Sequence, residues 1–201
     1  ETLRQAKYYG FSDLEISRLW EITTDQLRIF RKEADIEPGF QEINSLASNP
    51  LVHSNQFFIT YATENEISEQ AHKEKVFVIG AGPTKVGQGS EVDYETVHGL
   101  EELRRLGYET ILLNNNPDAY STSVQLADHL YYAPINAEAV LNIANVERPT
   151  YVITQLGGKS ASKLTAALAD AGLQILGATG AALDQVHQPE KMQRLLADLH
   201  L

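Results

Sequence analysis

The sequence predicts an α/β fold, a doubly wound parallel sheet of the Rossmann-like class, preceded by a small all-α segment. From about residue 73 onward, short apolar runs alternate with amphipathic helical segments, and each run ends at Gly, Asn or Pro. Runs that are apolar on both faces are typical of parallel strands covered by helices on both sides. Upstream of that point, helix-capping signals replace the apolar runs. We therefore expect a helical segment with its linker over residues 1–70 and an α/β domain over residues 73–201.

The N-terminal segment is expected to contain short helices. Leu3, Ala6 and Tyr9 share one helical face. Two capping boxes predict helices over 14–20 and 27–34, and they pair Ser12 with Glu15 and Thr23 with Gln26. The helical period is lost between Pro38 and Ala71, which indicates an extended arm or linker.

The elements of the α/β domain follow in the order strand, helix, strand. The predicted strands are 76–79, 110–113, 128–132, 151–154 and 175–176. The predicted helices are 91–106, 137–146 and 160–171, with one or two more over 181–201. Such sheets bind ligands outside the carboxyl ends of their strands. A site is therefore expected in the loops 80–90, 114–123 and 155–160.

The composition excludes several classes of function. The chain has no Cys, which excludes a disulfide framework, a thiol nucleophile and a cysteine-ligated metal, and which fits a reducing, cytoplasmic location. Its 27 acidic and 16 basic residues give a net charge of −11, which disfavours nucleic acid as a main partner. Apolar runs stop well before the roughly 18 residues that a membrane span needs, and the histidines lack metal-ligand spacing. Because the chain begins with Glu1, we expect a part of a longer polypeptide.

The first glycine-rich loop is Gly-Ala-Gly-Pro-Thr-Lys-Val-Gly-Gln-Gly over 80–89. A dinucleotide-binding fingerprint would need glycine at the position of Lys85. It would also need an acidic residue at the end of the second strand, which instead ends in asparagines at 114–116. Exposed backbone N–H groups that bind an anion are therefore favoured over NAD binding. They are also favoured over glycines that only permit a tight turn.

The second glycine-rich loop, Gly-Gly-Lys-Ser over 157–160, resembles the end of a phosphate-binding P-loop. That motif also needs glycine at the position of Ile153, which lies in a predicted strand. A glycine turn before a helix and a loop that contacts phosphate both stay open. Local structure explains Glu91 at a helix start and Asp118 in a turn.

Two function classes without catalysis are considered. The helices 14–20 and 27–34 could form a helix-turn-helix with Arg28, Arg31 and Lys32 on its second helix, which with a nucleotide-sensing domain would make a DNA-binding regulator. Residues 1–40 hold 8 acidic and 6 basic residues, however, whereas a groove-reading helix presents a basic face. Packing between helices or subunits is favoured, and a structural assembly module is the third class.

The order of the motifs resembles a known family. The sequences Gly-Ala-Gly-Pro-Thr-Lys-Val-Gly-Gln-Gly-Ser-Glu-Val-Asp-Tyr at 80–94, Gly-Tyr-Glu-Thr-Ile at 107–111 and Asn-Pro at 116–117 closely resemble the carbamoyl-phosphate synthase large subunit. The similar part is the pre-ATP-grasp domain, which precedes each ATP-grasp module of that subunit. Upstream, Ala-Lys at 6–7 and Gly-Phe-Ser-Asp at 10–13 resemble the end of its helical oligomerization domain. The chain thus resembles the junction that opens the second synthetase half.

The resemblance implies an ATP-dependent ligase as the parent protein. Such an enzyme makes carbamoyl phosphate from bicarbonate, glutamine-derived ammonia and two ATP, for pyrimidine and arginine biosynthesis. This part would hold no catalytic residue and no cofactor, because ATP and Mg²⁺ would bind an ATP-grasp module beyond Leu201, and the isolated chain would be inactive. Expected partners are the glutamine amidotransferase small subunit, the other large-subunit domains and further copies in an oligomer, with no nucleic acid and no membrane.

The resemblance also implies roles for loop residues. The passage that brings carbamate to the second half would be bordered by Lys85, Gly87, Gln88, Gly89, Glu91, Asn116 and Asp118. A second ligand-facing loop would contain Gly157, Gly158 and Lys159. The family usually has Arg at 85, Glu at 118, Asp at 123 and Gln-Thr-Pro at 159–161, whereas this chain has Lys85, Asp118, Ser123 and Lys159-Ser160-Ala161. Lysine lacks the planar fork of arginine.

Overall fold

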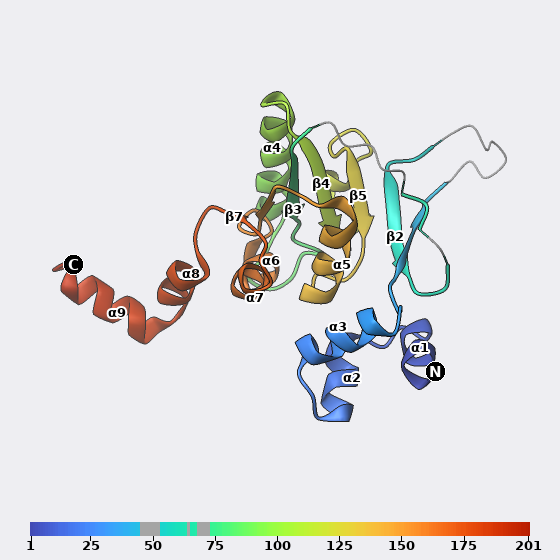
Figure 1. Ribbon diagram of the computed structural model, residues 1–201. Coiled ribbons are helices and arrows are strands. Elements are labelled where there is room, and N and C mark those ends of the chain that lie inside the picture. The colour runs from blue at the N-terminus through green and yellow to red at the C-terminus, as the bar shows by residue number, and fades with distance from the viewer. Residues whose placement is uncertain (45–52, 64, 68–72) are drawn as a thin grey trace.

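The computed structural model describes residues 1–44, 53–63, 65–67 and 73–201. Within these residues the sheet has seven strands in the order β1-β2-β5-β4-β3-β6-β7 (Figure 1). The strands are β1 Gly39–Glu42, β2 Gln56–Thr60, β3 Lys75–Ile79, β4 Glu109–Asn114, β5 His129–Tyr132, β6 Tyr151–Ile153 and β7 Ile175–Leu176. The helices are α1 Thr2–Tyr8, α2 Asp13–Trp20, α3 Thr24–Glu33, α4 Glu91–Arg105, α5 Ala137–Glu147, α6 Gly158–Ser162, α7 Thr165–Asp170, α8 Gly180–His187 and α9 Pro189–Asp198, with a short 3₁₀ helix η1 at Tyr120–Thr122.

The sheet is doubly wound, which confirms the predicted fold class. Neighbouring strands are parallel, except that β1 and β2 are antiparallel. β4 and β5 lie on one side of β3, whereas β6 and β7 lie on the other. The topological switch point, where such folds bind ligands, is therefore between β3 and β6.

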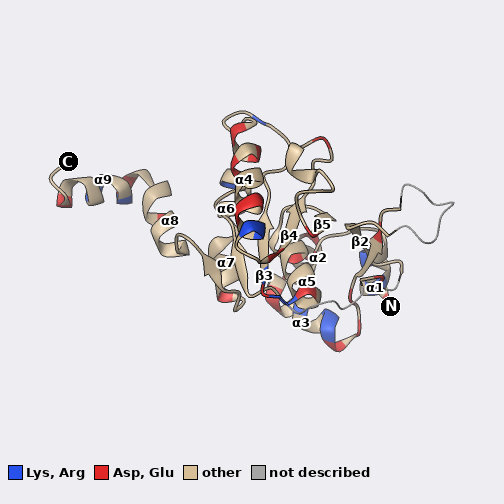
Figure 2. Ribbon diagram, turned by 90° about the horizontal axis from the view of Figure 1, so that it is seen from above, with Lys and Arg blue, Asp and Glu red and all other residues tan. Residues whose placement is uncertain are grey.

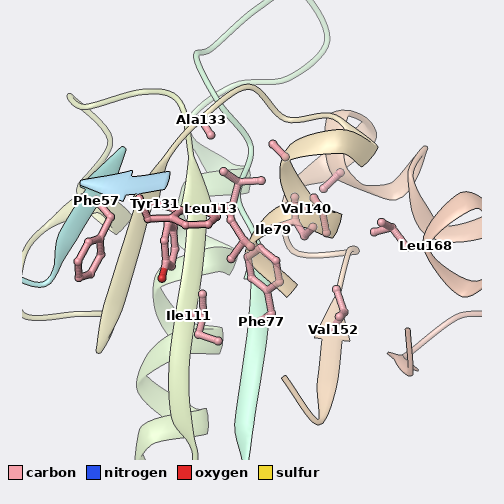
Figure 3. Close-up of a cluster of buried hydrophobic side chains, with 14 residues drawn as sticks. Phe57, Phe77, Ile79, Ile111, Leu113, Tyr131, Ala133, Val140, Val152 and Leu168 are labelled. Carbon is pink, nitrogen blue, oxygen red and sulfur yellow. The ribbon is translucent and has the colours of Figure 1, made fainter. Parts of the chain in front are cut away.

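Helices cover both faces of the sheet. Successive strand residues point to opposite faces. Phe77 and Ile79 pack with residues of α5, α6 and α7 in one buried cluster (Figure 3). Val76 and Val78 pack with residues of α4 in another cluster. The charged residues gather on the helices and loops (Figure 2), and the central strands beyond their first residues carry none.

The predicted helix over 160–171 is two helices, α6 and α7. The break precedes Thr165, whose hydroxyl donates to the Ser162 carbonyl at 2.8 Å and lies 2.6 Å from the Thr154 hydroxyl at the end of β6. A side chain that bonds to nearby backbone competes with regular helix geometry. The one or two helices predicted over 181–201 are found as two, α8 and α9, which extend away from the sheet (Figure 1).

The expectation of an arm or linker between Pro38 and Ala71 is wrong for two segments. β2 pairs in parallel with β5, and β1 pairs with β2, so both extend the sheet. The rings of Phe40 and Phe57 lie 5.5 and 5.4 Å from that of Tyr131, measured between centroids. β1 and β2 form strands because β2 pairs with β5, which lies far downstream in the chain. The local sequence pattern gives no sign of this pairing. Parts of the stretch lie outside the described residues, and the domain boundary near residue 70 stays a prediction.

A small core holds α1, α2 and α3 together. It contains Leu3, Ile16, Leu27 and Ile36. Both capping boxes are formed, as predicted. The helices begin directly after the capping residues, at Asp13 and Thr24, so α3 starts three residues before its predicted start at 27. The prediction that Tyr9 shares the apolar face of the first helix is wrong. Tyr9 lies after the last residue of α1 and is exposed, because the next residue has a φ of +87° and turns the chain.

A set of charged and polar side chains, buried or partly buried, joins these helices to α5. We call Lys7, Asp13, Arg31, Tyr61 and Glu138 the Glu138 network. Glu138 accepts hydrogen bonds from Lys7 Nζ at 2.5 Å, from the Asp13 backbone N–H at 2.6 Å and from the Tyr61 hydroxyl at 3.0 Å. Arg31 Nη2 donates to Asp13 Oδ2 at 2.8 Å. Arg31 is buried, so the helix-turn-helix alternative loses one of its three basic residues. None of the helices in the described ranges is long and apolar enough to cross a membrane.

Candidate functional site

The carboxyl ends of β3, β4 and β6 bring three predicted loops to one edge of the sheet. Asn114, the last residue of β4, connects two of them. Its Oδ1 accepts hydrogen bonds from the backbone N–H groups of Gly82 and Asn116, both at 3.1 Å. Its Nδ2 donates to Ser121 Oγ at 3.2 Å. Asn114 is buried and was not predicted as a site residue, although the run of three asparagines after a strand marks the position.

The loop after β3 ends in a tight turn whose tip is exposed. The backbone N–H groups of Lys85 and Gln88 each donate to the other residue's carbonyl at 2.9 Å. Gly87 has a φ of +79°, which L-residues with a side chain rarely adopt. Lys85, Val86 and Gly87 are exposed, so the tip presents one ammonium group, one apolar side chain and the backbone of Gly87 to its surroundings.

Gln88 anchors this turn from inside. Its side chain is 4 % exposed, and its Nε2 donates to the Ala81 carbonyl at 2.9 Å. Its Oε1 is buried without a hydrogen-bond partner within the described part of the chain. Gln88 thus supports the loop from below, whereas the predicted border of a passage would be formed by its exposed neighbours.

Glu91 lies at the start of α4, as predicted, and is exposed. Backbone N–H groups of Glu91 itself and of Gly89 hydrogen-bond to the carboxylate and lower its pKa, and the bond from Gly89 measures 2.9 Å. Hydrogen bonds to the charged form of a carboxyl group stabilise that form. Glu91 is therefore an ionised acceptor beside the loop after β3.

The two glycine-rich loops are in direct contact at the switch point. A Cβ atom on Gly157 would overlap the carbonyl oxygens of Ile79 and Gly80. Across the same junction, Lys85 Nζ donates to Ser160 Oγ at 2.5 Å. A dinucleotide between β3 and β6 would have to separate these loops, which counts against a nucleotide-sensing domain.

The remaining predicted residues take different positions. Gly157 is buried and precedes α6, as the glycine-turn interpretation predicts, whereas Lys159 is exposed on the first turn of α6. Gly158 packs against Gln88, since a Cβ on it would lie 2.9 Å from Oε1. Asp118 is exposed in a turn, where its backbone N–H donates to Asn116 Oδ1 at 3.1 Å. The structure thus connects Asp118 to Asn116, and Asn116 through Asn114 to the loop after β3.

The amino-acid sequence was compared with models of known protein families. The family model of the carbamoyl phosphate synthase pre-ATP-grasp domain matches residues 72–185, which is more than half of the chain. The chain belongs to this family. The matched part contains both glycine-rich loops, Asn116 and Asp118. Residues 1–71 lie outside the match, so the resemblance to an oligomerization domain stays a prediction.

Beside the asparagine run lies an open cavity of about 580 Å³. It lies over the ends of β4 and β5 and borders the loop of Asn116 and Asp118. Its lining carries no formal charge and consists of Ile43, Gln56, Asn115, Pro117, Tyr132, Ala133 and Pro134. A small polar molecule beside these loops would therefore meet amide and apolar groups on this side.

The opposite, amino-terminal edge of the sheet holds a set of charged and polar side chains that are buried or partly buried. We call Lys75, Glu109, His129, Tyr131 and Glu147 the amino-edge cluster. The ligand atoms of Glu109, His129 and Glu147 lie within 4.8 Å of one another, which is compatible with a metal ion. Lys75 Nζ, however, lies 2.6 Å from Glu147 and 3.3 Å from Glu109. The ammonium group already supplies the positive charge, so we assign no metal to this set.

Proposed function

We propose that this chain is part of a carbamoyl-phosphate synthase large subunit and that its exposed loops border the passage for carbamate. The parent enzyme would form carbamoyl phosphate from bicarbonate, glutamine-derived ammonia and two ATP, with its products entering pyrimidine and arginine biosynthesis. The match to the pre-ATP-grasp family over residues 72–185 supports this proposal. The role in the passage is supported by the exposed tip of the loop after β3. Lys85 at this tip contacts Ser160 of α6, at the switch point where related folds bind a nucleotide.

The chemistry of these loops suits a short-lived polar intermediate. Carbamate has a carboxylate that accepts hydrogen bonds and an amino group that donates them. Lys85 offers a positive charge, and Glu91 offers an ionised acceptor at the other end of the loop. Charged and polar groups held by the protein can replace the hydration shell of a transported molecule. The chain's residues would thus orient carbamate and exclude water, and the phosphoryl transfer would take place elsewhere.

Phosphoryl transfer needs clamped phosphates and Mg²⁺. We propose that an ATP-grasp module of the parent protein supplies both, and that the present domain supports that module. The remaining partners would be the glutamine amidotransferase subunit, the other large-subunit domains and further copies in an oligomer, in the cytoplasm. The close packing at Gly157 is consistent with an ATP site outside this domain, because the loops at the switch point pack against each other.

The experiment uses the complete large subunit that carries this segment. In the Glu91→Gln variant we expect carbamoyl phosphate synthesis to fall about tenfold, a loss of about 1.4 kcal/mol in transition-state stabilisation, because the ionised acceptor is removed. Bicarbonate-dependent ATP hydrolysis in the first half should persist. Glu95→Gln on the exposed side of α4 is the matched control and should behave as wild type. Equal loss of both activities in Glu91→Gln, or no loss at all, would count against the passage.

A further inference from the structure

A second cavity, of about 550 Å³, lies where the N-terminal helices meet the α/β part. Its walls come from the starts of α2, α3 and α5 and from the segment that includes α7 (Figure 1). This volume falls within the range of roughly 300–1,000 Å³ that is typical of pockets for small organic molecules. It lies apart from the loops of the proposed passage and is independent of the proposed function.

Most of the cavity surface is apolar. Leu14 lines the cavity and is 50 % exposed, although it is apolar. The other apolar side chains of the lining are Ala137, Leu141, Leu164, Ala167 and Ala171. A ligand with an aliphatic or aromatic body would remove this surface from water, which is the main source of affinity in such pockets.

The charges of the lining decide which ligand fits. Asp13 and Glu138 are neutralised by Lys7 and Arg31 within the Glu138 network. Asp25 is a further acid of the lining. Its carboxylate is paired with the guanidinium of Arg28, which also lines the cavity, at 3.6 Å. The Asp170 carboxylate forms no ion pair and no hydrogen bond with other side chains of the described residues.

Asp170 is the last residue of α7. The carbonyl groups at a helix end carry partial negative charge, so a carboxylate is disfavoured there and a cation is favoured. A positively charged group beside Asp170 would interact favourably with both the side chain and the helix end. An anion would be repelled by the same groups.

We propose that this cavity binds a small organic cation, an amine with a compact aliphatic or aromatic body. The ammonium group would lie beside Asp170, and the body would cover Leu14 and Leu141. The ligand would contact the N-terminal helices and the α/β part at once, so its binding would also stabilise their junction.

The test is calorimetric titration of the full 201-residue chain with hexylamine, with 1-hexanol and hexanoate as probes of equal length. We expect saturable binding of hexylamine at one site with a millimolar dissociation constant, and weaker binding of both other probes. Asp170→Asn should weaken hexylamine binding about fivefold, the factor expected for one exposed ion pair. Ala167→Leu, at an exposed helical position in the lining, should weaken binding of all three probes because it fills the cavity.

Asp198→Asn is the matched control, since Asp198 also is an exposed last residue of a helix but lies on α9, outside the cavity. It should leave hexylamine binding unchanged. The proposal is overturned by equal binding of hexylamine and 1-hexanol, by equal effects of Asp170→Asn and Asp198→Asn, or by the absence of saturable binding. Circular dichroism of each variant checks that the fold is retained.

Discussion

Replacing Glu147 by glutamine is expected to lower the free energy of unfolding by about 3–5 kcal/mol, the cost of breaking a buried ion pair from one side. Glu147 is 3 % exposed at the end of α5 and accepts hydrogen bonds from Lys75 at 2.6 Å, from His129 at 2.6 Å and from the Tyr131 hydroxyl. The glutamine would leave the buried Lys75 with only the partly exposed Glu109 as a counter-charge. Urea denaturation at pH 7 measures the change.

The stability difference between wild type and Glu147→Gln is expected to depend on pH. Burial alone would raise the pKa of Glu147, but the hydrogen bonds from His129, Lys75 and Tyr131 outweigh it and lower the pKa to about 2. A depressed carboxyl pKa contributes stability above the ordinary value of about 4.3, and this contribution is lost as the pH falls toward the folded value. The difference between wild type and Glu147→Gln should therefore be large at pH 7 and shrink between about pH 5 and pH 2.

The matched control is Glu102→Gln. Glu102 also pairs with a basic side chain, Arg105 at 2.6 Å, but on the exposed surface of α4. Exposed pairs contribute little to stability, so this variant should unfold close to wild type. Similar urea midpoints for all three proteins at pH 7 would show that the amino-edge cluster does not stabilise the fold.

Replacing Glu138 by glutamine is expected to release the N-terminal helices from α5. The carboxylate holds Lys7 Nζ, the Asp13 N–H and the Tyr61 hydroxyl, and the side chain of Lys7 is almost fully buried. Loss of the charge leaves the Lys7 ammonium with the Phe11 carbonyl and with Asp13 as a counter-charge, which it shares with Arg31. We expect a loss of about 3 kcal/mol and faster amide hydrogen exchange in α1, α2 and α3 than in the central strands.

Glu33→Gln is the control for this prediction, since Glu33 is the exposed last residue of α3. Its exchange rates should match those of wild type. If Glu138→Gln leaves exchange in residues 1–36 unchanged, the network does not hold the two parts together. If exchange rises equally in the central strands, the variant unfolds globally and the local role is wrong.

The central strands and the helix starts could be predicted from the sequence because their signals are local. The run 76–79 is apolar at every position and forms β3 after its first residue, Lys75. The capping boxes at Ser12 and Thr23 satisfy backbone N–H groups within one turn, so four residues suffice to mark a helix start.

The elements that sequence reasoning missed depend on contacts between distant segments. β2 exists because its backbone pairs with β5, and Phe57 finds its partner in Tyr131. The Glu138 network joins Lys7 to a residue far along the chain. Such pairings follow from the fold as a whole, and single charged residues give no local sign of them.

The candidate site was predicted in its location but not in its internal contacts. The order of strands and helices places the loops at one edge, and the structure confirms that they meet there. The role of Asn114 as a connector and the overlap that any side chain at Gly157 would cause depend on distances that no motif encodes.

The passage for carbamate is tested most directly by the number of ATP molecules hydrolysed per carbamoyl phosphate formed, measured on the complete large subunit with Lys85→Met and Lys85→Arg. Methionine removes the charge at the exposed tip of the loop, whereas arginine keeps it. We expect the ratio to rise in Lys85→Met, because carbamate escapes before the second phosphorylation, and to stay at the wild-type value in Lys85→Arg. An unchanged ratio and an unchanged rate of synthesis in Lys85→Met would contradict a passage bordered by this loop.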